Sequence, residues 1–131
     1  MLKAIFAALA IAVVVFVALV ALQPSEFKVA RSAVIAAPPA EVFGLVNDFR
    51  AWKAWDPWAE LDPNSKAVYE GPTSGAGAVF GWSGNDKVGE GRMTIAESRP
   101  HERIRIDLEF SKPMKATNVT EFTFEPDGGG T

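Results

Sequence analysis

The chain has 131 residues and a net charge of −3, and its first 22 residues contain a single charged side chain, Lys3. The rest has the composition of one mildly acidic soluble domain, because a chain of this length holds one core and not two, which excludes a multidomain enzyme. The absence of cysteine excludes disulfides and thiolate metal sites, and the scattered basic residues predict no nucleic-acid partner.

The segment from Ala4 to Leu22 is an unbroken run of 19 apolar residues. As a helix it extends over about 28 Å, which matches the hydrocarbon thickness of a bilayer. We therefore predict a transmembrane signal-anchor helix over residues 1–22, with residues 4–22 in the membrane. A cleaved secretory signal is the first alternative, although Leu19-Val20-Ala21 places leucine where the cleavage site needs a small residue. A buried helix of a soluble protein is the second.

The charges around this run set the expected orientation. Lys3 and the terminal amine precede the run, while Lys28 and Arg31 follow it, so the bias is small. A short positive head before an apolar run is typical of a signal-anchor, which predicts a single-pass protein of the cell membrane with an extracytoplasmic domain. Residues 23–26 form a short polar linker.

The domain, residues 27–131, begins with segments of contrasting pattern. Phe27 to Ile35 interleaves Val, Ile and Phe with polar residues, which predicts a strand. Pro38-Pro39 ends that strand and is well placed in the first turn of a short amphipathic helix. The apolar face of this helix consists of Val42, Phe43, Val46 and Phe49.

A second helical turn or two is expected from Phe49 to Trp55, ending before Pro57. Trp52, Trp55 and Trp58 follow one another at intervals of three residues in this region. Two interpretations remain open: the tryptophans pack the helix pair onto a sheet, or at least one of them lines or gates a ligand cavity.

From Lys66 onward, two-residue alternation interrupted by glycines predicts antiparallel strands joined by tight turns. The clearest alternation of apolar and charged residues runs from Arg103 to Phe110. It predicts a strand with one buried face and one face exposed to solvent. The expected strands cover residues 66–71, 76–83, 87–98, 103–110 and 115–125.

Glycines on adjacent strands predict a strongly curved sheet, because glycine within strands marks bulges and bends. These glycines do not form a phosphate loop, since strands rather than a helix follow them. The apolar residues on the inner side of such a curve would line an apolar cavity. The predicted ligand-binding residues are Trp55, Phe80, Trp82, Met93, Ile106, Leu108, Phe110 and Phe122.

Titratable residues give no recognisable catalytic centre. The only histidine, His101, lies in a Pro-His-Glu turn, and no histidine and cysteine cluster exists. We therefore predict no catalytic residue, no metal and no cofactor. Four residues would place a charge inside the cavity if their strand faces turn inward: Glu90, Arg92, Glu97 and Glu121.

The last residues, from Pro126 to Thr131, are turn residues followed by one residue of a partner strand. Two short helices are too few to cover an apolar face of five or six strands. We therefore expect a fragment that lacks at least one strand and a covering helix; a disordered glycine tail is the alternative.

Several motifs together resemble the helix-grip superfamily, and within it the bacterial polyketide cyclase/dehydrase-like proteins called SRPBCC. The resemblance covers about residues 27 to 131 and rests on the Ala-Pro-x-x-x-Val-Phe segment of residues 37–43 and on Val88-Gly89-Glu90-Gly91. It implies an α+β fold in which a seven-stranded curved antiparallel sheet grips a long C-terminal helix, with a hydrophobic pocket between them. Against this pattern, we expect the sequence to lack the last strand and that helix.

These features together predict a membrane-anchored binding or carrier domain for a hydrophobic small molecule or lipid. The alternative is an enzyme of the polyketide cyclase/dehydrase-like type that acts on such a ligand through an inward charge, such as Glu90 or Arg92. A protein that only supports another membrane partner is a third possibility.

Overall fold

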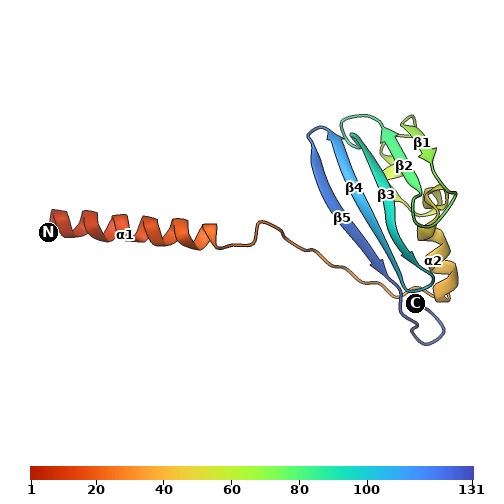
Figure 1. Cartoon of the computed structure of the whole chain (residues 1–131), viewed down its shortest axis with the longest axis horizontal. Coiled ribbons are helices and arrows are strands. Elements are labelled where there is room, and N and C mark those ends of the chain that lie inside the picture. Colours follow the sequence, from red (N-terminus) through yellow and green to blue (C-terminus); the bar gives the residue numbers. More distant parts are fainter. The chain divides into compact units, whose positions relative to one another are not determined.

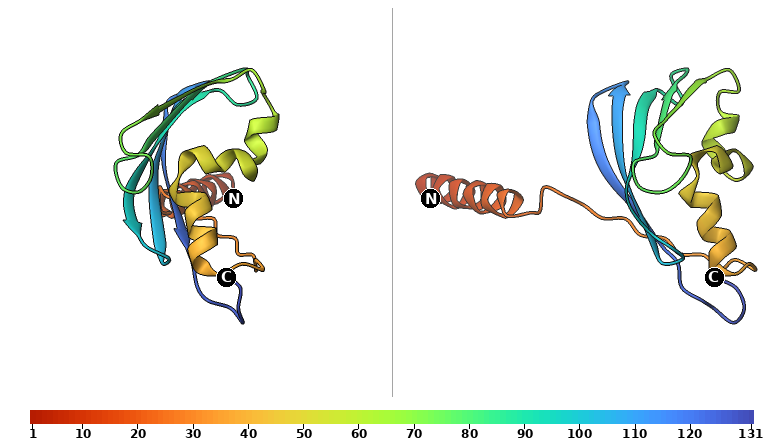
Figure 2. Two further views of the ribbon diagram at one scale, coloured as in Figure 1. Left: turned by 90° about the vertical axis from the view of Figure 1, so that its right-hand side faces the viewer. Right: turned by 45° about the vertical axis from the view of Figure 1, so that its right-hand side comes forward.

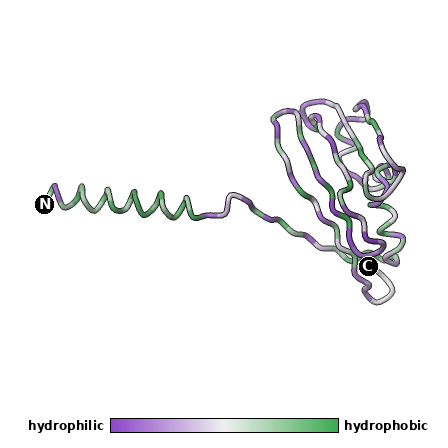
Figure 3. Tube along the Cα trace, in the orientation of Figure 1, coloured by the Kyte–Doolittle hydropathy of each residue, from purple (hydrophilic) through white to green (hydrophobic).

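The computed structural model describes all 131 residues, which divide into two compact units, Met1–Ser32 and Ala33–Thr131. The first unit contains α1 (Leu2–Ala21), a helix that is hydrophobic along nearly its whole length (Figure 3) and has no buried residue. By length and composition α1 can cross a membrane, a test that signal sequences also pass. An N-terminal apolar helix is thus confirmed, and its use as signal or anchor stays a prediction.

The second unit is an α+β domain built on one antiparallel sheet (Figure 1). Its five strands pair in sequence order, each with the next, so every connection is a turn or short loop. The expected strands are confirmed with shifted ends: β2 and β3 begin three residues later than expected, because Gly75, Gly77 and Gly89 take positive φ values in the turns before them, and β4 runs two residues further. The strands are β1 (Lys66–Glu70), β2 (Val79–Ser83), β3 (Glu90–Arg99), β4 (Arg103–Lys112) and β5 (Ala116–Thr123).

Three short helices precede the sheet in the sequence. α2 (Pro39–Asn47) begins after Pro38 with proline in its first turn, as predicted. The next turns form two 3₁₀ helices, η1 (Phe49–Ala54) and η2 (Pro57–Glu60). The side chains of Asp48 and Asp56 begin these helices by accepting hydrogen bonds from backbone N–H groups two residues on.

The core lies between α2 and one face of the sheet, which curves around the helices (Figure 2). We call this the inner face and the opposite one the outer face. Ile95, Ile104 and Ile106 are fully buried on the inner face. The apolar side of α2 covers them with Val42, Phe43 and Val46, together with Phe49 of η1.

The strand predicted over Phe27–Ile35 is wrong. Residues 27–34 belong to no strand and form no hydrogen bond between backbone groups, because no neighbouring strand pairs with them. Only Ile35 is paired: its N–H donates to the carbonyl of Thr131 at 2.8 Å, and the N–H of Thr131 donates back at 2.9 Å. An alternating pattern favours a strand, but a strand forms only where a partner satisfies its backbone groups.

Candidate functional site

The inner face gathers seven of the eight predicted ligand-binding residues. In the sheet register Phe80 opposes Met93, which opposes Leu108, so these three side chains point to the same face. Trp82 and Phe110 both oppose Gly91 and share that face. Ile106 lies two residues before Leu108 in β4, and Phe122 opposes Ile104, two residues further back, so both also share it. The strand pairing therefore places these seven side chains on one face of the sheet, as the sequence predicts.

Burial divides these seven residues into two groups. Ile106 is fully buried in the core beneath α2, where no ligand reaches it without displacing the helix. The other six are half-buried, and five of them lie on β2, β3 and β4. These are Phe80, Trp82, Met93, Leu108 and Phe110, which continue the apolar surface of the core toward the end of the sheet that bears the β2–β3 and β4–β5 loops.

The eighth residue, Trp55, joins this surface from the helices. Its ring lies 4.6 Å from that of Trp52, which meets Phe122 of β5 edge-on at 6.1 Å. The indole N–H groups of Trp55 and Trp52 donate to the carbonyls of Leu45 and Val46, at 3.0 and 2.9 Å. Since the last carbonyls of a helix have no partner within it, the two tryptophans both satisfy the end of α2 and present their rings to the inner face.

Trp52 was not among the predicted ligand-binding residues, although it connects Trp55 to the sheet. Its i+3 spacing from Trp55 was the available signal. This pair agrees with both interpretations of the tryptophans. The indoles pack η1 against α2, and 39% of the Trp55 surface stays exposed to solvent.

The far end of the inner face is shaped around Gly91. The ring of Trp82 lies over this glycine, so that an added Cβ would approach the ring to 2.6 Å. Its indole N–H donates to the carbonyl of Val88 at 2.9 Å, and its ring meets Phe110 edge-on at 5.7 Å. The absence of a side chain at position 91 therefore leaves room for the Trp82 ring against the strand.

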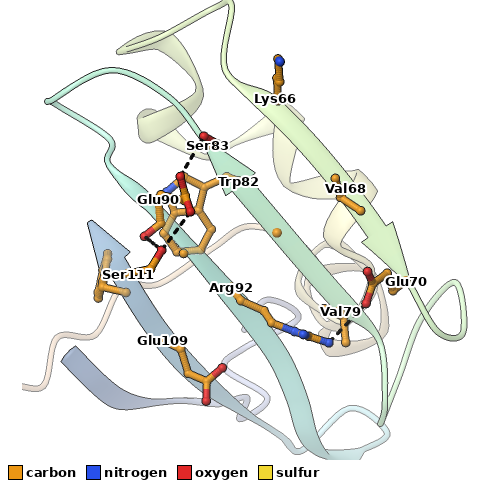
Figure 4. Close-up of a pocket in the computed structure, with 13 residues that line it drawn as sticks. Lys66, Val68, Glu70, Val79, Trp82, Ser83, Glu90, Arg92, Glu109 and Ser111 are labelled. Atoms are coloured by element: carbon orange, nitrogen blue, oxygen red, sulfur yellow. Dashed lines mark hydrogen bonds and ion pairs between the residues drawn. The ribbon is translucent and has the colours of Figure 1, made fainter. Parts of the chain in front are cut away.

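The outer face carries the charged side chains. Glu90 and Arg92, which an enzyme would need on the inner side, both lie on this face, because Arg92 opposes Gly81 and Glu109, and Glu90 opposes Ser83. A hollow of about 470 Å³ lies among them (Figure 4). Arg92 and Glu70 form an ion pair of 3.2 Å at one side of it. Of the predicted ligand-binding residues, only Trp82 and Phe110 border this hollow.

At the other side of the hollow, Glu90 is held by three neighbours. The hydroxyl of Ser83 donates to its carboxylate at 3.2 Å, Lys112 lies at 3.6 Å, and Ser111 donates at 3.2 Å. These contacts, the Ser83 hydrogen bond first, lower the pKa of Glu90 below its ordinary value. Glu90 is therefore a stable anion that ties β2, β3 and β4 together. The carboxylates of this face form no group of three that could hold a metal ion.

The alternation of strand residues could not predict this hollow. It forms where Gly81 lacks a side chain between Val68 and Arg92, and where the β3–β4 register shifts between Glu90 and Gly91. Gly81 and Gly91 mark the place of the hollow in the sequence, but glycines within strands indicate curvature and do not by themselves indicate a hollow.

The chain was compared with known proteins. The profile of the family described as polyketide cyclase/dehydrase and lipid transport matches residues 26–131, which is all of the chain except the apolar helix and the start of the linker. No curated protein and no solved structure matches the chain.

Proposed function

Because the chain belongs to the polyketide cyclase/dehydrase and lipid transport family (SRPBCC), which implies binding of a hydrophobic ligand or lipid, we propose that the inner face of its sheet is the surface that binds this ligand. The domain acts as a binding or carrier module of the helix-grip type over residues 27–131. α1 anchors it in the membrane, with the domain on the extracytoplasmic side.

The observation that carries the proposal is the half-buried apolar surface beyond α2. Met93, Leu108 and Phe110 are only partly covered, although they continue the fully buried row of Ile95, Ile104 and Ile106. Each methylene of a ligand that this surface removes from water contributes about 0.8 kcal/mol. An acyl chain or a fused-ring compound therefore binds there by burial alone.

Binding is favoured over catalysis by the charges. At the uncovered end of the inner face the strand partners are Ala67, Trp82, Gly91, Phe110 and Ala116 in one row, and Tyr69, Phe80, Met93, Leu108 and Asn118 in the next. None of these strand residues is ionised, and Glu90 and Arg92 point to the outer face. The one charged group that reaches the inner row is the guanidinium of Arg50 in η1, which stacks on the ring of Tyr69 at 4.6 Å. A general acid or base must reach the reacting group, so the enzyme alternative lacks a placed residue.

Native mass spectrometry of the full-length protein, purified in mild detergent from its own host, tests the proposal. We expect a co-purified hydrophobic compound that is released on unfolding. An empty protein that also gains no stability from a panel of lipids and aromatic polyketides contradicts it.

A matched pair of substitutions then locates the site. Leu108→Gln places an amide on the inner face, and we expect it to weaken binding of the co-purified compound about tenfold, because an apolar contact is replaced by an unpaired polar group. Val119→Gln makes a comparable change on the exposed outer side of β5 and leaves the affinity unchanged. Equal effects of the two substitutions would exclude the inner face as the binding surface.

A further inference from the structure

One basic residue of the helices stands at the margin of the inner face. Arg50 is the second residue of η1 and directly follows Phe49, which is buried in the core. Residues three apart lie on the same side of a 3₁₀ helix, so Phe49 and Trp52 form the side of η1 that packs on the sheet. Arg50 lies beside that side, and its guanidinium reaches Tyr69 of β1, 4.6 Å from the centre of the ring.

Tyr69 connects Arg50 to the ligand-binding surface of the proposed function. It opposes Phe80 in the β1–β2 register, and the two rings lie 5.3 Å apart. Phe80 opposes Met93, and Met93 opposes Leu108. These inner-face residues form one row across the sheet, about 14 Å long from β1 to β4 at ordinary strand spacing. Arg50 therefore places a positive charge at the β1 end of a continuous apolar row.

The guanidinium of Arg50 has no polar partner within the domain. It belongs to none of the ion pairs, whereas Arg92, Arg99 and Arg103 each pair with a glutamate. Asp48, the acidic residue nearest in the chain, accepts a hydrogen bond from the backbone N–H of Arg50 at 2.9 Å and so caps η1. The side-chain donors of Arg50 are thus available to a ligand.

The contact with Tyr69 prepares this guanidinium for an anion. A guanidinium over an aromatic ring is attracted to the π electrons without using a hydrogen bond, so its five N–H donors stay free. A carboxylate accepts two parallel hydrogen bonds from such a fork. Because the ring already holds the arginine, less side-chain freedom is lost when an anion binds. The arrangement therefore suits a ligand that has an anionic group beside its apolar part.

We propose that Arg50 binds the head group of the ligand, and that the ligand is an amphiphile with a carboxylate at one end, such as a long-chain fatty acid. Its apolar chain lies along the row from Phe80 to Leu108, and its carboxylate meets the guanidinium beside Tyr69. A carboxylate fits better than a phosphate monoester, because it brings one negative charge to one guanidinium, whereas the phosphate brings nearly two at neutral pH. The inference rests on the proposed function, since it names the ligand class of the same surface.

Arg105 provides a matched control for this residue. It is a second arginine without an ion pair, but it lies on the outer face of β4, where it is exposed. Its substitution removes the same charge from the domain and leaves the inner face unchanged. A difference between the two positions therefore reports contact with the ligand and not the net charge of the protein.

The experiment uses the full-length protein in mild detergent and a pair of probes with the same chain, hexadecanoic acid and hexadecan-1-ol. Native mass spectrometry at mildly alkaline pH, where the acid is ionised, measures the affinity of each probe. The proteins are the wild type, Arg50→Gln, Arg50→Lys and Arg105→Gln. Because the variants are compared with the same probe in the same detergent, loss of probe to the micelles cancels in the ratio of affinities.

We expect Arg50→Gln to weaken the binding of hexadecanoic acid about tenfold, because a hydrogen bond between two charged groups is lost. Arg50→Lys keeps the charge but not the planar fork, so its loss should be smaller. Neither substitution should change the affinity for hexadecan-1-ol, and this unchanged affinity also shows that the variants are folded. Arg105→Gln should bind both probes as the wild type does.

The two probes separate this inference from the proposed function. If the wild type binds both probes and Arg50→Gln binds the acid as tightly, only the role of Arg50 is contradicted. Equal losses in Arg50→Gln and Arg105→Gln, or an equal loss for the acid and the alcohol in Arg50→Gln, would contradict that role as well. A wild type that binds neither probe contradicts both proposals.

Discussion

On the inner face, Ile104 and Ile106 are fully buried beneath α2, whereas their neighbours on the outer face, Arg105 and Asp107, are exposed. The same strand therefore meets two environments at alternate residues. Side chains of the inner face are buried and pack against apolar and aromatic neighbours. Side chains of the outer face form ion pairs and hydrogen bonds while exposed to water. Stability should thus depend on the inner face far more than on the outer one.

The largest effect is expected from the buried row. Ile104→Ala removes a fully buried side chain and should lower the free energy of unfolding by about 2–5 kcal/mol. Val119→Ala, on the outer face, should cost less than about 1 kcal/mol. Urea unfolding of the full-length protein in mild detergent measures both. If Ile104→Ala does not fold, Ile104→Val should still cost about 0.5–1.5 kcal/mol, and equal costs on the two faces would contradict the comparison.

A smaller effect is expected at Gly91, where the inner face has no room for a side chain. A Cβ there would lie 2.5 Å from the carbonyl of Glu109 and 2.6 Å from the ring of Trp82. Gly91→Ala should therefore destabilise the domain by about 1–3 kcal/mol. Gly44→Ala is the control, because nothing lies within 4 Å of its added Cβ in α2, and helix propensity predicts a gain of up to about 1 kcal/mol. A tolerated alanine at position 91 would mean that Trp82 is not held against the strand.

The outer-face ion pair should contribute little. Arg92 and Glu70 lie 3.2 Å apart, but their side chains are 51% and 57% exposed. Water and salt screen such a pair, so Arg92→Ala should change the free energy of unfolding by less than about 1 kcal/mol and by less still in high salt. Unfolding at two salt concentrations measures this, and a large salt-independent loss would show that the pair is structural.

The smallest effect is the pH dependence that Glu90 introduces. Its pKa is lowered in the folded state, so its contribution is present at neutral pH and is lost as the pH falls from the unfolded pKa through the folded one. Glu90→Gln should lower the stability at neutral pH by that contribution and, in the same step, remove the acid-side loss. Unfolding curves from neutral to acidic pH check this, and an unchanged slope in the variant would assign the loss to other carboxylates.

The local sequence pattern was sufficient to predict which side chains share each face of the sheet. The alternation from Ile104 to Phe110 and the glycine-bounded strands predicted which side chains share the inner face, and the helix after Pro38-Pro39 followed from proline placement and apolar spacing. These features depend on residues close together in the chain. The family resemblance was likewise confirmed by the match over residues 26–131.

Features that depend on distant partners were not predictable in this way. The extended segment Phe27–Ile35 has a strand pattern, but only Ile35 finds a partner, at Thr131. The full burial of Ile106 depends on where α2 crosses the sheet. The outer hollow depends on a register shift beside Gly91, which no local pattern encodes.

The most direct test of the central claim, that the inner face binds the ligand, is photo-crosslinking of the full-length protein with a photoactivatable fatty acid, followed by peptide mapping. We predict labelled peptides from β3 and β4 with the modification at inner-face residues such as Met93, Leu108 and Phe110, and loss of this labelling when unlabelled fatty acid competes. Labelling confined to α1, or to the outer face at residues such as Val68 and Val79, would contradict the claim.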